Sequence, residues 1–123
     1  MTSTVLVVDD EPDIRLTLRF MLEGAGHTVV EAATGADALT RLRAERPDLV
    51  LLDIRLPDMD GWDVMASIRS SVELSAVPIL IMSAHSSGDF RDRATQEGGR
   101  GYLVKPFREE DLVEAVGALL DCG

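Results

Sequence analysis

Residues 48–62 read DLVLLDIRLPDMDGW. Residues 49–52 are apolar at every position, which is typical of a strand buried on both faces of a parallel sheet. Asp53 closes this run, and a polar loop that contains Pro57 and ends at Gly61 follows it. In open α/β sheets, ligands bind beyond the carboxyl ends of the strands. The segment therefore predicts an α/β fold with Asp53 at its ligand-binding edge.

The rest of the chain repeats the same unit of a short apolar run followed by an amphipathic stretch. Three further apolar runs lie at residues 5–8, 78–82 and 102–104, and residues 27–31 predict a further, shorter strand. The stretches between them carry apolar residues at helical spacing, as do Ile14, Leu18, Met21 and Leu22. Five β-α units in sequence indicate a parallel sheet with helices on both faces, and the length fits a single domain over residues 1–123.

Local signals place several of the helix ends. Pro and Gly at its two ends predict a first helix over residues 12–24, and a capping-box-like start predicts a second over residues 34–45. Residues 86–99 predict a weaker helix, because its apolar anchors are only Phe90 and Ala94.

Composition excludes several classes of function. The formal net charge is -10, so nucleic acid and anionic membranes would be repelled. The single cysteine, Cys122, allows no intrachain disulfide and fits a reducing compartment. Neither a basic leader nor a long apolar stretch is present, so we expect no signal peptide, no membrane span and a cytoplasmic location.

The residues that close the apolar runs point to one site. Asp9 and Asp10 follow the first run, Asp53 the third, Ser83 the fourth and Lys105 the fifth. Two like charges about 4 Å apart repel by roughly 1 kcal/mol in water and roughly 4 kcal/mol at an effective dielectric near 20. Three clustered carboxylates therefore need a cation, and Mg²⁺ suits oxygen ligands of this kind. With the charge offset, a carboxylate can accept a phosphoryl group.

Each of these residues also has an ordinary structural interpretation. Asp10 could cap the first helix, Ser83 could cap a later one, Asp53 could be a polar strand end, and Lys105 could be a solvated lysine in a turn. Taken singly, these interpretations are favoured. Taken together, these structural interpretations are weak, because they do not explain why all of these residues stand at the ends of apolar runs.

Four blocks of sequence resemble the receiver domain of two-component response regulators. They are VLVVDDEP at 5–12, the segment 48–62 quoted above, PILIMSA at 78–84 and GYLVKPF at 101–107. The resemblance extends over roughly residues 5–120. It implies a flavodoxin-like, doubly wound (βα)5 three-layer sandwich with a parallel five-stranded sheet of order 2-1-3-4-5.

The resemblance also implies roles for individual residues. Asp53 would be the phosphoacceptor, and Ser83 and Lys105 would each hold a phosphoryl oxygen. Tyr102 would be the switch aromatic that moves with Ser83. The expected ligands of Mg²⁺, with Mn²⁺ as an alternative ion, are the following: Asp10, Asp53, the backbone carbonyl of Arg55, and Asp9 through water. The family further implies a cis peptide bond between Lys105 and Pro106.

The function implied in this way is signalling and not turnover of an external substrate. The phosphoryl group would come from a phosphohistidine of a sensor histidine kinase or histidine phosphotransfer protein. Phosphorylation would change binding to a downstream protein, without direct nucleic-acid binding or membrane insertion. One departure lies before the switch aromatic, where Gly99 and Gly101 stand in place of the common Ala and Asp.

Three other functions remain as alternatives. A receiver-like interaction module that is never phosphorylated would not need all of the site residues. A metal-dependent phosphatase with an aspartate nucleophile usually has a second aspartate two residues later, where this chain has Arg55. A nucleotide or flavin binder is disfavoured because the turn at residues 9–12 is acidic and lacks glycine.

Overall fold

The computed structural model describes residues 3–84 and 87–121. The elements, in chain order, are β1 (Thr4–Val8), α1 (Pro12–Gly24), β2 (Thr28–Ala32), α2 (Gly35–Glu45), β3 (Leu49–Asp53), α3 (Gly61–Ser70), β4 (Ile79–Ser83), α4 (Gly88–Gln96), β5 (Gly101–Val104) and α5 (Glu109–Asp121). Each predicted apolar run coincides with a strand to within one residue at either end. Cys122 and the expected helix start at Ser86 lie outside the described residues.

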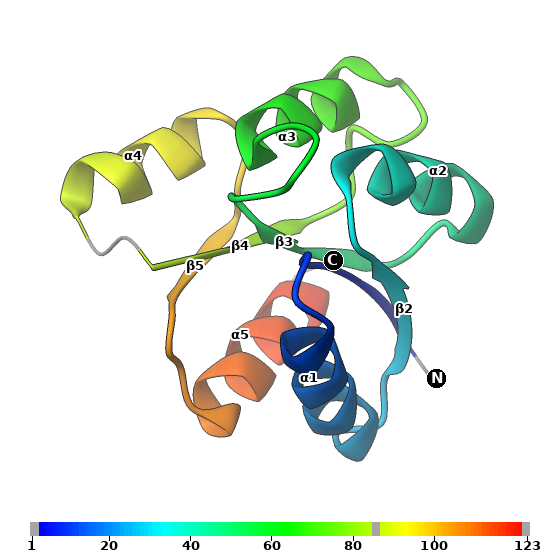
Figure 1. The fold of residues 1–123 in the computed structure, drawn as a ribbon, viewed down its shortest axis with the longest axis vertical. Coiled ribbons are helices and arrows are strands. Elements are labelled where there is room, and N and C mark those ends of the chain that lie inside the picture. The colour runs from blue at the N-terminus through cyan, green and yellow to red at the C-terminus, as the bar shows by residue number, and fades with distance from the viewer. Residues whose placement is uncertain (1–2, 85–86, 122–123) are drawn as a thin grey trace.

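The five strands are all parallel, in the order β2-β1-β3-β4-β5. Helices α1 and α5 cover one face of the sheet, and α2, α3 and α4 cover the other (Figure 1). This is the doubly wound, flavodoxin-like (βα)5 sandwich that the sequence predicts. None of the helices in the described part of the chain is both long and apolar enough to cross a membrane.

Two apolar cores, one on each face, explain why the central strands consist almost entirely of apolar residues. On β1, Val5 and Val7 belong to the core beneath α1 and α5, whereas Leu6 and Val8 belong to the core beneath α2, α3 and α4. All residues of β3 and β4 are buried. Because side chains alternate between the faces of a strand, burial on both faces leaves only the strand ends for polar groups.

The starts of α2 and α3 are capped by side chains, whereas the start of α1 is not. Thr34 accepts a hydrogen bond from the Asp37 backbone N–H, as the predicted capping sequence requires. Asp60 caps α3 in the same manner through Asp63 N–H. Helix α1 has Glu11 at its N-cap position, without a side-chain cap. The interpretation of Asp10 as the cap of α1 is therefore wrong.

Helix α4 is shorter than the predicted 86–99 segment at its C-terminal end. Gly98 has φ of 102°, a left-handed conformation that glycine adopts without a Cβ penalty and that stops the helix. The Gly98 and Gly99 amides then donate to the carbonyls of Thr95 and Ala94. The two glycines thus end the helix, and they are not part of it.

The predicted anchors of α4 do hold it to the sheet. Ala94 is buried, and Phe90 packs between Trp62 of α3 and Tyr102 of β5, with ring centroids 5.4 Å and 6.3 Å away. The Arg93 guanidinium lies 4.4 Å from the centre of the Trp62 ring, which adds a cation–π contact. A row of aromatic rings therefore connects α3, α4 and β5.

Gly61, at the start of α3, packs against the backbone of the preceding strand and loop. A Cβ atom there would lie 2.7 Å from Ile54 Cα and 3.0 Å from the Asp53 carbonyl oxygen. Since backbone cannot yield as a flexible side chain can, Gly61→Ala should destabilise the protein by about 1–3 kcal/mol, as overpacking does in other cores. Urea denaturation would measure this change in the free energy of unfolding.

Gly117 in α5 provides the matched control, because no atom lies within 4 Å of a Cβ placed there. Gly117→Ala should stabilise the protein by up to about 1 kcal/mol through helix propensity. Equal effects of the two substitutions would contradict the close approach at Gly61.

Candidate functional site

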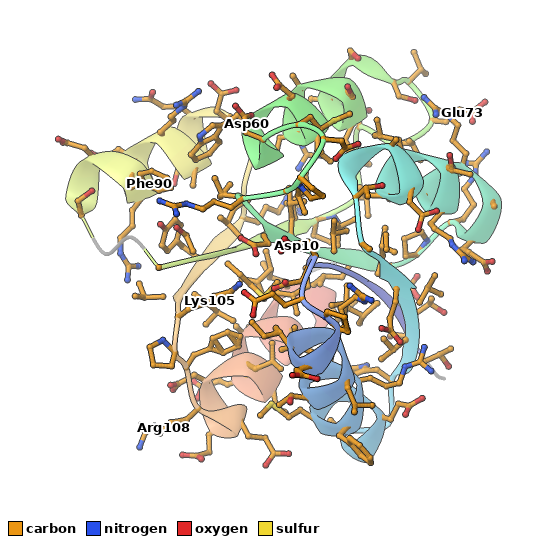
Figure 2. The ribbon with its side chains drawn as sticks, viewed as in Figure 1. Asp10, Asp60, Glu73, Phe90, Lys105 and Arg108 are labelled. Atoms are coloured by element: carbon orange, nitrogen blue, oxygen red, sulfur yellow. The ribbon has the colours of Figure 1, made fainter. Side chains whose placement is uncertain are left out.

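The predicted site residues meet at the carboxyl-terminal edge of the sheet. Asp9 and Asp10 follow β1, Asp53 and Ser83 are the last residues of β3 and β4, and Lys105 follows β5. Figure 2 shows Asp10 and Lys105 between the two helical layers. A pocket of about 450 Å³ opens here and is lined by Asp10, Glu11, Asp53, Arg55, Leu56, Pro57, Ser83, Ala84 and Lys105.

The Lys105 ammonium bridges two buried carboxylates. Its Nζ lies 2.9 Å from Asp9 Oδ2 and 2.9 Å from Asp53 Oδ2. The other oxygen of each carboxylate accepts a backbone N–H, from Glu11 to Asp9 at 2.9 Å and from Arg55 to Asp53 at 3.0 Å. Both carboxylates are therefore held in fixed orientations by one ammonium group and one backbone amide each.

The backbone after β5 places this lysine. The Lys105 N–H donates to the Ser83 carbonyl at 2.8 Å, which extends the pairing of β4 and β5 by one further bond. The peptide bond between Lys105 and Pro106 is cis, as predicted. Lys105 thus reaches the ends of β1 and β3 from the far side of β4.

The site carries more negative than positive charge. Burial raises the pKa of Asp53 above its ordinary value, because the hydrogen bonds from Lys105 and Arg55 only partly offset the loss of water and the nearby Asp9 opposes ionisation. Burial acts to lower the pKa of Lys105, but its contacts with Asp9 and Asp53 outweigh burial and raise it. One ammonium group therefore stays charged among three carboxyl groups.

The acidic group fits a hard divalent cation. One carboxylate oxygen each from Asp9, Asp10 and Asp53 can be chosen so that all three lie within 4.8 Å of one another. Oxygen ligands and an excess of negative charge are what Mg²⁺ requires, and exposed Asp10 leaves room for waters on the ion. Arg55 lines the same pocket, so its backbone is near the acidic group.

Two supporting residues were missed by reasoning from the sequence. The Arg15 guanidinium donates to the Asp9 carbonyl oxygen at 2.6 Å and also bonds Glu31 of β2. Asp58 in the loop after β3 accepts two backbone N–H bonds from α2. Neither residue closes an apolar run, so their positions carry no signal of the kind that identifies the other site residues.

The doubly wound fold and its acidic edge together define the class of this protein as a receiver-type α/β signalling domain. Residues 5–117 match the family model described as response regulator receiver domain. The chain belongs to this family, whose members are signalling modules and not turnover enzymes on external substrates. Receiver domains typically bind Mg²⁺ at an acidic pocket such as this one.

Individual relatives agree with the family match. PilH of Pseudomonas aeruginosa is 35% identical over 116 residues, which cover 94% of this chain and 96% of PilH. The transcriptional regulatory protein PrrA of Mycobacterium tuberculosis is 41% identical over 116 residues, 94% of this chain and 49% of PrrA. The chain thus spans about half the length of that regulator.

Among solved structures, the chemotaxis response regulator CheY4 of Vibrio cholerae superimposes with a TM-score of 0.92 at 30% identity. The match covers 97% of this chain and 99% of CheY4. The fold is therefore shared along nearly the whole chain.

Removing the Lys105 ammonium should destabilise the metal-free protein, because it leaves the Asp9 and Asp53 carboxylates without their cation. Fully buried pairs lose roughly 3–5 kcal/mol when one partner is removed. The Lys105 side chain is 20% exposed, so Lys105→Ala should cost about 1–3 kcal/mol in EDTA, and Mg²⁺ should restore part of it. Chemical denaturation with and without Mg²⁺ measures both effects.

Arg108→Ala is the control. Arg108 also forms ion pairs, but its own side chain is 76% exposed. Its cost should be at most about 1 kcal/mol and insensitive to Mg²⁺. Equal losses of stability in Lys105→Ala and Arg108→Ala, with an equal response to Mg²⁺, would contradict the bridging role of Lys105.

Metal binding should stabilise the fold, because it relieves repulsion among Asp9, Asp10 and Asp53. With a dissociation constant on the order of 1 mM, about 10 mM Mg²⁺ adds roughly 1.4 kcal/mol by linkage. This corresponds to a rise of a few degrees in Tm for a domain of this size. Asp10→Ala should abolish the rise while leaving the metal-free protein at least as stable. The same rise in wild type and variant would exclude Asp10 as a ligand.

Proposed function

We propose that this protein is a phosphoacceptor in a two-component pathway. It takes a phosphoryl group onto Asp53 from a phosphohistidine of a sensor histidine kinase or histidine phosphotransfer protein, in a reaction that depends on Mg²⁺. The observation that carries the proposal is the environment of Asp53. Its carboxylate ends a buried strand, Lys105 holds one oxygen, a backbone amide holds the other, and two further carboxylates lie beside it.

The chemical step needs an ionised, oriented carboxylate. An Asp53 oxygen forms a bond to phosphorus, the bond between phosphorus and the donor imidazole nitrogen breaks, and the electron pair remains on that nitrogen. The bond from Lys105 favours the ionised form of Asp53 and limits rotation of the Asp53 side chain. Asp10, Asp53, the Arg55 carbonyl and, through water, Asp9 would hold Mg²⁺, and the ion would supply positive charge to offset that of the transferred group.

Lys105 and Ser83 would stabilise the product. Both line the pocket around Asp53, and Lys105 can exchange part of its contact with the carboxylates for a phosphoryl oxygen. The Ser83 hydroxyl would donate to another phosphoryl oxygen. These contacts supply preorganised positive charge and hydrogen bonds at the place where charge accumulates.

Tyr102 would pass the change to the surface. Ser83 pairs with Val104 in the β4–β5 register, and Tyr102 lies two residues earlier on β5. Its half-buried ring contacts Phe90 of α4, so movement of Tyr102 with Ser83 would alter the packing of α4. A downstream protein that binds this side of the molecule would then sense phosphorylation.

The proposal extends to the whole chain and its setting. We assign residues 1–123 to one receiver domain that acts in the cytoplasm through protein partners. The net charge of -10 supports protein contacts and not direct binding to nucleic acid or insertion into a membrane.

Incubation with acetyl phosphate and Mg²⁺ tests the proposal. Intact-mass analysis should show one added phosphoryl group, which is lost in base because an acyl phosphate is hydrolysed there. Asp53→Asn should remain unmodified, whereas Asp63→Asn, at an exposed carboxylate in the first turn of α3, should be modified like the wild type. A folded wild type without an adduct would favour the alternative of an interaction module that is not phosphorylated.

A further inference from the structure

The loop between β3 and α3, residues 54–60, is closed tightly at its base. The Gly61 N–H donates to the Ile54 carbonyl at 2.6 Å, and Arg55 and Asp60 form an antiparallel bridge. Asp60 marks the end of this loop in Figure 2. The base therefore fixes the two ends of the loop to each other, but it leaves the direction of the tip to other contacts.

The tip of the loop is attached to the start of α2. The Asp58 carboxylate accepts the backbone N–H of Gly35 at 2.8 Å with Oδ1 and that of Ala36 at 2.9 Å with Oδ2. The amides of Ala36 and Gly35 hold the pKa of Asp58 below its ordinary value, so the group is ionised at neutral pH. Thr34 caps the same helix through a different amide, that of Asp37. Asp58 is therefore a second, distant cap.

A side-chain contact reinforces this attachment. Met59 packs against Gly35, where an added methyl group would overlap with the Met59 side chain. Met59 and Leu56 also pack against the core beneath α2, α3 and α4. The absence of a side chain at Gly35 thus lets the loop lie flat on α2.

The attached loop leads directly to the acidic site. Arg55, the second residue of the loop, donates its backbone N–H to Asp53 Oδ1. Arg55, Leu56 and Pro57 form one side of the pocket above Asp53. Only Leu56 and Pro57 separate Asp58 from Arg55. The bonds at the base join the two ends of the loop but do not tie them to α2, so loss of the Asp58 attachment would let the Arg55 peptide shift and would loosen one of the two bonds that orient the Asp53 carboxylate.

We propose that Asp58 is a positioning residue for the metal and phosphoryl site. Its carboxylate ties the β3–α3 loop to the N-terminus of α2, and the tied loop holds the Arg55 backbone in place beside Asp53. The inference rests on the proposed function, because it assigns a support to the same site. Asp58 itself touches neither the ion nor the phosphoryl group.

The test compares Asp58→Ala with wild type by two measurements. Amide hydrogen exchange in EDTA should be faster at Arg55 in the variant, because its bond to Asp53 is less well held. Titration with Mg²⁺, followed by amide NMR shifts, should give a dissociation constant raised by at least about three-fold, below the 10–100-fold typical of residues that contact metal ligands directly. The variant should remain folded, since Asp58 is exposed.

Three variants separate positioning from other effects. Thr34→Ala removes the other cap of α2 and should change neither the Arg55 exchange rate nor the Mg²⁺ dissociation constant. Asp58→Asn keeps one acceptor oxygen for the α2 amides and should fall between wild type and Asp58→Ala. Gly35→Ala displaces Met59 without a change of charge and should weaken Mg²⁺ binding in the same direction as Asp58→Ala.

Each result supports or overturns the inference. Equal Mg²⁺ affinity and equal Arg55 exchange in wild type and Asp58→Ala would overturn it and leave the proposed function intact. Identical losses in Asp58→Asn and Asp58→Ala, with no loss in Gly35→Ala, would assign the effect to charge and also overturn it. A wild type that binds no Mg²⁺ would overturn the proposed metal dependence and, with it, this inference.

Discussion

The site at the carboxyl-terminal edge of the sheet depends on one ammonium group that bonds two buried carboxylates. Lys105 reaches Asp9 and Asp53, which end β1 and β3, from a position after β5. The topology brings three carboxylates together, and burial makes their mutual repulsion costly. Lys105 limits this cost, but burial still raises the pKa of Asp53, and the nearby Asp9 adds to the rise. The remaining negative charge is what suits the site to a divalent cation.

Two apolar cores hold this edge in place. Strands β3 and β4 are buried along their whole length, so they can carry polar groups only where they end. Helices cover both faces of the sheet (Figure 1), and a pocket opens at that edge. A rigid sheet therefore presents a small set of charged groups at fixed positions, which is the arrangement that phosphoryl transfer by positioning and charge neutralisation requires.

Two connections lead from the site into the helical layer above it. One is the loop after Asp53, which Asp58 and Met59 attach to the start of α2. The other is the row of Trp62, Phe90 and Tyr102, which joins α3, α4 and β5. Both belong to the face covered by α2, α3 and α4. Under the proposed function, a change at Asp53 would reach that face by two separate routes.

The sequence by itself determined the five strands, the burial of β1, β3 and β4 on both faces, and the five polar residues that close β1, β3, β4 and β5, because apolar runs and the polar residues that end them are local patterns. The cap at Thr34 and the anchors Phe90 and Ala94 were predictable for the same reason. Only the tertiary structure decided that α4 ends at Gln96, that Asp10 does not cap α1, and that Lys105 bonds Asp9 as well as Asp53. Asp58 is the clearest case, since its partners lie 23 and 22 residues away. Such contacts depend on how helices and loops pack against one another, and that geometry is set by the whole core and not by any local pattern.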